Sequence, residues 1–477
     1  MTELTQTAYP PHTLRAAVAT GQMNRRAWLI TGMLVIFQMI NFADKAVLGL
    51  VAEPAMRELG LSASEFGFIG SAFFFLFAIS AVCVGFLAAR VPTRWILLTM
   101  GVLWSVLQFP ILFGGGAAVL LVTRIVLGAA EGPATPTTLH HVHGWFPARE
   151  RGLPSTLVAI GSTLGPIVAA PILAYIIAHP QWGWRWAFGF LGLVGFIWSV
   201  LWLLVAKEGP YSHLKGKHQE GAQGAEPAQD QAPGKERASI AENADTLKQV
   251  PIFRVFCSRM FIIATLAGAG CFWAQGFLTT WSPRYLGAVV SLSPEMVGLV
   301  STFPWLFGAL TLGVLGYASR VMMRRGVSVY LSLGASFGLV LLLSGVCFLI
   351  LPHLQGYAAV TVLVVAAGLA MTFPLAPTAV AFCVASKQRG AVMATLTAVA
   401  SLGGIVAPVM VGFLMERAGY LQAGKGAPQS MEMTARLAEG MNASFAYIGC
   451  YLVVVGFVSI FCLNPDRTAK KLQKRFA

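Results

Sequence analysis

Twelve apolar stretches, each long enough to cross a lipid bilayer as a helix, constrain this chain more than any other feature. They lie at residues 28–50, 66–89, 95–113, 117–139, 154–178, 186–206, 260–283, 296–318, 328–351, 357–382, 390–415 and 443–463. A helix of about 20 apolar residues spans a hydrocarbon layer of about 30 Å and satisfies its own backbone polar groups there. Only 11% of the 477 residues are charged, against about 25% in a soluble domain. The sequence therefore predicts an all-α membrane protein whose twelve transmembrane helices contact membrane lipid.

The net charge of +14 follows this topology. If both termini lie on one side, Lys and Arg number 25 in the segments on that side and 6 in the loops on the other. Cytoplasmic segments of membrane proteins are enriched in Lys and Arg. We therefore expect both termini in the cytoplasm, and we attribute the basic charge to topology and not to a nucleic-acid partner.

A polar segment divides the chain into two sets of six helices. Its centre is rich in Gly, Ala, Gln, Pro and Glu, which is typical of a flexible linker that cannot bury a core. The expected organisation is a cytoplasmic tail at 1–27, a first bundle at 28–206, a cytoplasmic linker at 207–253, a second bundle at 254–463 and a cytoplasmic tail at 464–477.

The two sets of helices are related in sequence. Residues 163–169 (Thr-Leu-Gly-Pro-Ile-Val-Ala) recur as residues 401–407 (Ser-Leu-Gly-Gly-Ile-Val-Ala), and the Arg-Gly pair at 151–152 recurs at 389–390. Both repeats are offset by 238 residues. Parallel repeats are typical of transporters in which two bundles enclose a substrate site near the bilayer midplane. We therefore expect two pseudo-symmetric six-helix bundles.

Four ionisable residues lie deep inside the expected spans, namely Asp44 and Lys45 in the first and Arg124 and Glu131 in the fourth. A charge at the bilayer centre costs at least about 2.5–3.5 kcal/mol, so it is expected to face a cavity and to have a partner. Asp44, Lys45 and Arg124 lie at similar distances from the outer ends of their helices. Glu131 follows Arg124 by two helical turns, which places it about 10 Å deeper.

These charges suggest a transport mechanism. At rest, each carboxylate is expected to pair with Arg124 or Lys45. An organic anion that binds the same cations displaces a carboxylate, which then takes up a proton because it is unpaired and out of water. The alternative is a structural ion-pair network that holds the first and fourth helices together.

Other polar and aromatic residues of the spans are candidates for the wall of the cavity. They are Gln38, Asn41, Phe73, Phe74, Ser162, Gln275, Phe277 and Trp281. Polar groups in apolar helices also form interhelical hydrogen bonds, and a run of Phe is also typical of packing. Both interpretations stay open for each of these residues.

Three histidines, His140, His141 and His143, cluster near the inner end of the fourth span. No carboxylate or Cys stands near them in the sequence as a further ligand, so we expect interfacial histidines and no metal site. The chain has no catalytic constellation and no added soluble domain, so neither a membrane-embedded enzyme nor a sensor is expected.

Several motifs resemble those of the anion:cation symporters of the major facilitator superfamily. Residues 41–46 (Asn-Phe-Ala-Asp-Lys-Ala) are similar to the Asn-Tyr-x-Asp-Arg-x signature of the family's first helix, and residues 124–133 resemble its fourth-helix motif. Residues 145–151, 183–188 and 281–286 are similar to the family's 4–5 loop, the start of its sixth helix and its seventh helix.

The resemblance implies the major facilitator fold and alternating access in a bacterial inner (plasma) membrane. It further implies import of a small organic anion by proton symport, with Asp44 and Glu131 carrying protons and Lys45 and Arg124 serving the anion. Protons would be the coupling ion, with no cofactor. Sugar acids, dicarboxylates and aromatic acids all fit the sequence. The alternative on the same fold is an organic-anion exchanger or facilitator without proton coupling.

The sequence departs from the family at three places. Lys45 stands where the family usually has Arg and offers a point charge in place of a bidentate fork. The 2–3 loop motif at residues 85–90 has Ala89 where the family has Asp, and the equivalent segment at 316–320 also lacks it. In the family that Asp helps to latch the outward-open state, so the gate of this chain departs from the family pattern.

Overall fold

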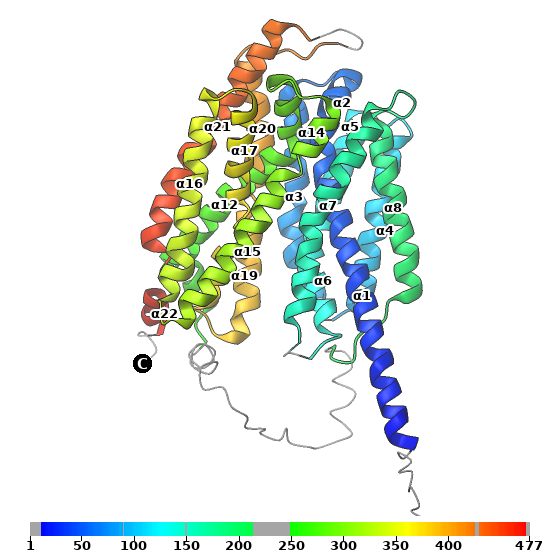
Figure 1. Ribbon diagram of the computed structural model, residues 1–477, viewed down its shortest axis with the longest axis vertical. Helices are drawn as coiled ribbons and strands as arrows, with labels where there is room; N and C mark the ends of the chain where they lie inside the picture. The colour runs from blue at the N-terminus through cyan, green and yellow to red at the C-terminus, as the bar shows by residue number, and fades with distance from the viewer. Residues whose placement is uncertain (1–10, 89, 148–149, 213–248, 425–428, 474–477) are drawn as a thin grey trace, which may run out of the picture.

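The computed structural model describes residues 11–88, 90–147, 150–212, 249–424 and 429–473. Its helices form two bundles that lie side by side (Figure 1). Most of the expected linker, the first ten residues, Ala89 of the 2–3 loop motif and the last four residues lie outside the described residues.

The first bundle, which we call the N-bundle, contains eight labelled helices. They are α1 Pro11–Leu50, α2 Ala52–Leu59, α3 Ala63–Leu87, α4 Thr93–Leu112, α5 Ala117–Glu131, α6 Ala134–His143, α7 Gly152–Ala178 and α8 Trp184–Val205.

The second bundle, the C-bundle, is built from shorter pieces. They are α11 Ile252–Phe256, α12 Arg259–Thr280, α13 Ser282–Arg284, η1 Tyr285–Val289, α14 Pro294–Val300, α15 Phe303–Arg324, η2 Tyr330–Ala335, α16 Ser336–Ile350, η3 Leu351–His353, α17 Gly356–Ala370, α18 Leu375–Ala381, α19 Ser386–Ala400, α20 Gly403–Arg417, α21 Met431–Cys462 and α22 Pro465–Gln473.

Twelve of the described helical spans are long and apolar enough to cross a membrane, which confirms the predicted number. Most of them begin and end within a few residues of the expected bounds, although α1 already begins at Pro11, before the expected start at residue 28, and the eighth span ends at Arg324 and not at residue 318. The last expected bound is wrong at its start, because α21 begins at Met431 and not at residue 443. The Ser430 hydroxyl caps this helix by accepting a hydrogen bond from the Met433 amide at 3.2 Å, so polar turns precede the apolar part.

Two spans in corresponding places of the bundles are interrupted. The fourth span breaks between Glu131 and Ala134, and the tenth breaks between Ala370 and Leu375. Each break contains a proline (Pro133 in the fourth span), which cannot donate a helical hydrogen bond. Interrupted helices at matched positions of two repeats are typical of transporter binding sites. The break places Glu131 at the very end of α5.

Pairs of glycines fix the helices that carry the four charges. Gly161 and Gly165 of α7 lie against the backbone carbonyl oxygens of Val35 and Met39 in α1, where a Cβ atom would collide. A second pair, spaced by the same four residues in and just after α5, lies against carbonyl oxygens of α3. Small residues spaced by four let membrane helices approach closely. The registers of α1 against α7 and of α5 against α3 are therefore set by backbone contact.

The two ends of the bundles differ. The helix α2 lies at one end, which we call the α2 face, whereas the start of α1 and the helix α22 lie at the other, which we call the terminal face (Figure 1). The bundles contact each other toward the α2 face, where both the backbone amide and the hydroxyl of Ser64 in α3 donate to Glu416 Oε1 in α20 at 2.8 Å. Gly67 and Gly412 bring the same two helices close together.

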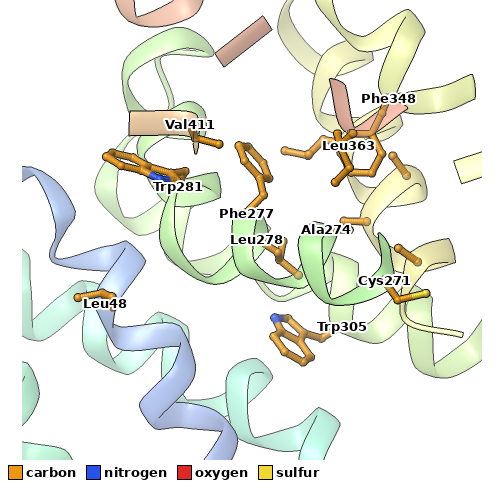
Figure 2. Packing of buried hydrophobic residues seen from close by; sticks show 14 of the residues in the cluster. Leu48, Cys271, Ala274, Phe277, Leu278, Trp281, Trp305, Phe348, Leu363 and Val411 are labelled. Atoms are coloured by element: carbon orange, nitrogen blue, oxygen red, sulfur yellow. The ribbon is translucent and has the colours of Figure 1, made fainter. Parts of the chain in front are cut away.

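Apolar packing continues this seam between the bundles. The larger cluster of buried apolar side chains includes Leu48 of α1 together with Phe277, Trp281 and Trp305 of the C-bundle (Figure 2). Trp281 packs edge-on against Phe66 of α3 with ring centroids 5.6 Å apart. The molecule is therefore closed between its bundles toward the α2 face.

Candidate functional site

Lys45 and Glu131 form the central ion pair of the N-bundle. The ammonium Nζ of Lys45 lies 2.5 Å from Glu131 Oε2, and it also donates to the side-chain oxygen of Asn41 at 2.8 Å and to its backbone oxygen at 3.3 Å. The Glu131 side chain is fully buried, whereas 11% of the Lys45 side chain is exposed. The cation is thus the accessible member of the pair.

The direction of the Lys45 side chain explains this pairing. Long side chains on a helix point back toward its N-terminus, and in α1 this direction leads from Lys45 toward Asn41 and the terminal face. Lys45 therefore reaches Glu131 at the break in the fourth span, although Glu131 lies two turns beyond Arg124. The expected depth difference is bridged by the length of the lysine.

Asp44 has a different environment from its neighbour in the sequence. Its Oδ1 accepts a hydrogen bond of 2.9 Å from Nε2 of Gln108 in α4, and it is 1% exposed. Arg124 donates to the backbone oxygen of Asp44 at 3.2 Å. Among the described residues, no cationic nitrogen lies within 4.0 Å of the Asp44 carboxylate. The expectation that each carboxylate pairs with Arg124 or Lys45 thus holds for Glu131 and is wrong for Asp44.

Arg124 is held inside the N-bundle. It is 3% exposed, and its guanidinium carbon lies 5.2 Å from the ring centroid of Phe188 in α8. A cation over an aromatic face is stabilised by the ring quadrupole. In this conformation Arg124 contacts the backbone of α1 and an aromatic ring, and Lys45 is the cation nearer to the space between the bundles.

A short polar chain connects α1, α6 and α7 on the terminal-face side of the ion pair. Gln38 Nε2 donates to the hydroxyl of Thr135 at 3.0 Å and lies 3.5 Å from that of Ser162. Thr135 is exposed although it lies within a membrane span. The helix α6 lies on the side of its bundle that faces the C-bundle (Figure 1). These hydrogen-bonded side chains therefore form part of the wall of the N-bundle that faces the C-bundle.

Three buried polar atoms in this wall have no hydrogen bond of good geometry, namely Gln38 Oε1, Asn41 Nδ2 and Glu131 Oε1, although the Asn41 amide and the Glu131 carboxylate lie close enough to interact. Buried polar atoms in proteins are almost always paired, and an unpaired one calls for an explanation such as an ion or ligand. The set combines an acceptor, a donor and a carboxylate oxygen beside an ammonium group. Such a set can bind an anion that also carries hydroxyl groups.

Aromatic rings surround the ammonium group of Lys45. Its Nζ lies 4.4 Å from the ring centroid of Phe42 and 5.7 Å from that of Phe73. Phe42 packs edge-on against Trp305 of the C-bundle at 5.9 Å. Phe74, which follows Phe73 in the sequence, packs against Gly404 of α20. The cation thus lies close to the seam, and the rings contribute to its low exposure.

The three candidates from the C-bundle differ in their surroundings. Gln275 is half-buried in α12, and Phe277 packs against Phe445 inside the C-bundle. Trp281 is fully buried in the seam, where its Nε1 donates to the carbonyl oxygen of Pro408 at 2.9 Å. The structure brings together Gln38, Asn41, Lys45, Phe73, Glu131 and Ser162, and it places Asp44 and Arg124 directly behind them.

Sequence reasoning missed two residues of the site, Gln108 and Thr135. Gln108 was detectable, because a buried amide in an apolar span also needs a partner. Thr135 gives no such signal, because a hydroxyl on a helix can bond to the backbone of its own helix.

The histidine cluster is engaged in local contacts. His141 Nδ1 lies 2.8 Å from the hydroxyl of Thr93, and His143 Nε2 lies 2.8 Å from that of Ser155. Within the described ranges, no three His, Cys, Asp or Glu residues are grouped so as to hold a metal ion.

Comparison with known proteins agrees with the fold. The Major Facilitator Superfamily model matches residues 34–346 and 291–477. A probable sulfoacetate transporter of Cupriavidus necator is 27% identical over 397 residues, which cover 82% of this chain and 88% of that protein. A hexuronate transporter of Bacillus subtilis is 25% identical over 390 residues (81% and 87%), and a D-galactonate transporter of Escherichia coli is 25% identical over 430 residues (85% and 93%).

Solved structures share the whole architecture. A bacterial homologue of the human lysosomal transporter Spinster has a TM-score of 0.72 at 18% identity, covering 94% of this chain and 98% of its own. A D-xylose-proton symporter has a TM-score of 0.67 at 13% identity, covering 92% and 98%. These relatives are transporters and not enzymes, as expected. The chain is therefore a membrane transporter that belongs to the major facilitator superfamily, with its predicted pair of six-helix bundles.

Proposed function

We propose that this transporter imports a small organic anion with a carboxylate group by proton symport through alternating access. The names of the relatives support the substrate class, because hexuronate and D-galactonate are sugar acids and sulfoacetate carries a carboxylate and a sulfonate. The unpaired amide atoms of Gln38 and Asn41 favour an anion with hydroxyl groups.

The distribution of basic residues supports an orientation for this proposal. The 25 Lys and Arg of the segments on the terminal side, against 6 on the other, place the terminal face in the cytoplasm and the α2 face outside. The bacterial inner membrane is then the site of action. Since the seam is closed toward the α2 face, the conformation described here is closed to the outside in this orientation.

The observation on which the proposal rests is the Lys45–Glu131 ion pair. Its cation is partly exposed, and one oxygen of its carboxylate accepts no hydrogen bond of good geometry. An anion that enters the space between the bundles meets Lys45 first, since 11% of this side chain and none of Glu131 is exposed. When the anion takes the ammonium group, Glu131 loses its only described cationic partner. A proton on Glu131 Oε1 then restores neutrality in a site where an unpaired charge is costly.

Asp44 and Arg124 form the second part of the proposed mechanism. Asp44 is tied to Gln108, and Arg124 is tied to the same turn of α1 through the Asp44 backbone. Asp44 is therefore placed to exchange a proton without direct contact with the anion. Arg124 offsets the charge of the two acids and reaches the anion only after α1 and α5 move relative to each other.

The deciding experiment uses purified protein in liposomes that enclose a pH-sensitive dye. Carboxylates of the three candidate types are added outside, and the internal pH and the uptake of labelled substrate are followed. Symport predicts internal acidification that depends on substrate. It also predicts that Glu131→Gln abolishes the acidification while exchange of labelled substrate persists.

An exchanger is the second candidate function, favoured by the neutral balance of two acids and two bases. It predicts exchange of labelled substrate with no change in internal pH in the wild-type protein. In that case Asp44 and Glu131 serve to hold the two cations and carry no proton.

A further inference from the structure

Arg284 is a buried cation in the seam between the bundles at the α2 face. It ends the short helix α13, directly after Pro283, and it is 4% exposed. Its NH2 group donates to the hydroxyl of Tyr420 at 3.2 Å, and its NH1 group forms an ion pair with Glu53 of α2. Its Nε is buried and has no hydrogen-bond partner.

Glu53 is shared between the two bundles. Its other oxygen, Oε1, lies 2.7 Å from Arg57, one turn further along α2. The side chain of Glu53 is 39% exposed, so its carboxylate is open to exchange with solvent or with another anion. One acid thus faces two arginines, and this part of the seam carries a net positive charge.

The two arginines respond differently when the bundles part at the α2 face. Arg57 keeps Glu53, because both belong to α2. Arg284 and Tyr420 stay together in the C-bundle and lose the only carboxylate that the structure gives them. Of the polar partners that the structure describes for Arg284, only the Tyr420 hydroxyl then remains beside it.

We propose that Arg284, with the Tyr420 hydroxyl, is an entry site that binds the carboxylate or sulfonate of the incoming anion when the α2 face is open. Glu53 occupies this site as a tethered carboxylate when the face is closed. Arg presents a planar fork of donors that suits such groups. The inference rests on the proposed function, since it takes the transported anion as the ligand and the α2 face as the side of entry.

The competing interpretation is that the Arg284–Glu53 ion pair only holds the α2 face closed, as a latch. The direction in which two variants change the KM for uptake separates a latch from an entry site. Glu53→Gln and Arg284→Gln remove the same ion pair. A latch therefore predicts the same shift for both, toward the open α2 face and a lower KM for uptake. An entry site predicts opposite shifts, because Glu53→Gln removes the competitor whereas Arg284→Gln removes the site.

The test measures uptake into right-side-out membrane vesicles, and into inside-out vesicles for the reverse direction, with the carboxylate identified in the liposome assay. We expect Arg284→Gln to raise the KM for uptake about tenfold, the effect of losing one hydrogen bond to a charged group. Glu53→Gln should lower it severalfold, and Arg284→Lys should restore part of the loss. A variant cannot change the equilibrium of transport, so the ratio of Vmax to KM must fall by the same factor in both directions. For Arg284→Gln we expect this tenfold fall to appear as a lower Vmax in the reverse direction.

Two controls accompany the variants. Arg57→Gln removes the other partner of Glu53 within α2 and leaves the ion pair between Glu53 and Arg284 in place, and it should leave the KM close to that of the wild type. Glu416→Gln weakens a different contact across the seam, with Ser64, and should lower the KM for uptake as a latch does.

The outcomes distinguish the two proposals. Equal shifts for Glu53→Gln and Arg284→Gln, or no shift for either, would overturn the entry site while wild-type transport stands. If the wild-type protein transports no carboxylate of the panel, the proposed function is wrong and the entry site falls with it.

Discussion

Gly128 of α5 lies against the backbone carbonyl oxygen of Phe73 in α3, with no space for a methyl group between them. Four residues later, Gly132 makes the same contact with Phe77. Glu131 lies between the two glycines, so the depth and direction of this carboxylate depend on the approach of the two helices.

Gly128→Ala should therefore destabilise the protein and disturb the site. Overpacking of a well-packed interior costs about 1–3 kcal/mol, so the midpoint of thermal unfolding of the purified protein should fall. The matched control is Gly85→Ala, also in a membrane helix, because a Cβ atom at Gly85 meets nothing within 4 Å. Equal unfolding midpoints for the two variants would contradict the packing argument.

Lys45→Gln should weaken substrate binding, because it removes the cation that is accessible to the anion and leaves Glu131 without its partner. Loss of a hydrogen bond to a charged group weakens binding about tenfold to hundredfold. Calorimetric titration with the identified substrate measures this effect. Lys207→Gln, at an exposed position, is the control and should bind as the wild type does. Unchanged affinity in Lys45→Gln would remove Lys45 from the site.

Gln108→Leu tests whether Asp44 takes part in proton coupling. The amide of Gln108 donates to Asp44 and favours the ionised carboxylate. Without it a proton binds more readily, so the pH at which uptake is half-maximal should rise. Ser105→Ala, on the same helix, removes only a hydrogen bond to the Gly101 carbonyl and should leave the pH profile in place. An unshifted profile in Gln108→Leu would mean that Asp44 does not titrate during transport.

Trp281→Phe tests the predicted role of Trp281 in substrate binding against its position in the seam. The variant keeps a ring against Phe66 and loses the hydrogen bond to Pro408. If Trp281 belongs to the gate, turnover changes and substrate affinity measured from the terminal face does not. The control is Trp202→Phe, which loses an equal hydrogen bond of 2.9 Å to the Arg94 carbonyl inside the N-bundle. A loss of affinity specific to Trp281→Phe would favour the substrate contact.

The cost of polar groups in a membrane made much of this molecule predictable from its sequence. Continuous apolar runs revealed the spans, and the expense of a charge in lipid singled out Asp44, Lys45, Arg124 and Glu131. Their partners could not be read in the same way. Depth along a helix gives the level of a Cα atom, whereas the pairing depends on side-chain direction, as with Lys45, and on amides of a third helix, as with Gln108.

The helix breaks and the seam were also outside the reach of the sequence. Pro133 marks a possible interruption, yet prolines also lie inside the unbroken helix α7. The helices that contact each other across the bundles depend on the conformation that the transporter adopts. A transporter that works by alternating access adopts more than one conformation with the same sequence.

The four charges all belong to the N-bundle, whereas the described C-bundle residues nearest to them at mid-membrane, such as Trp305, are aromatic or uncharged. The two halves share a sequence repeat but differ in the charged residues that they contribute. Substitutions in the C-bundle wall can reshape the space for the rest of the anion without altering the groups placed to handle its charge and the proton. Under the proposed function, a lineage with this arrangement can acquire a new acid as substrate while it retains the same source of energy for uptake.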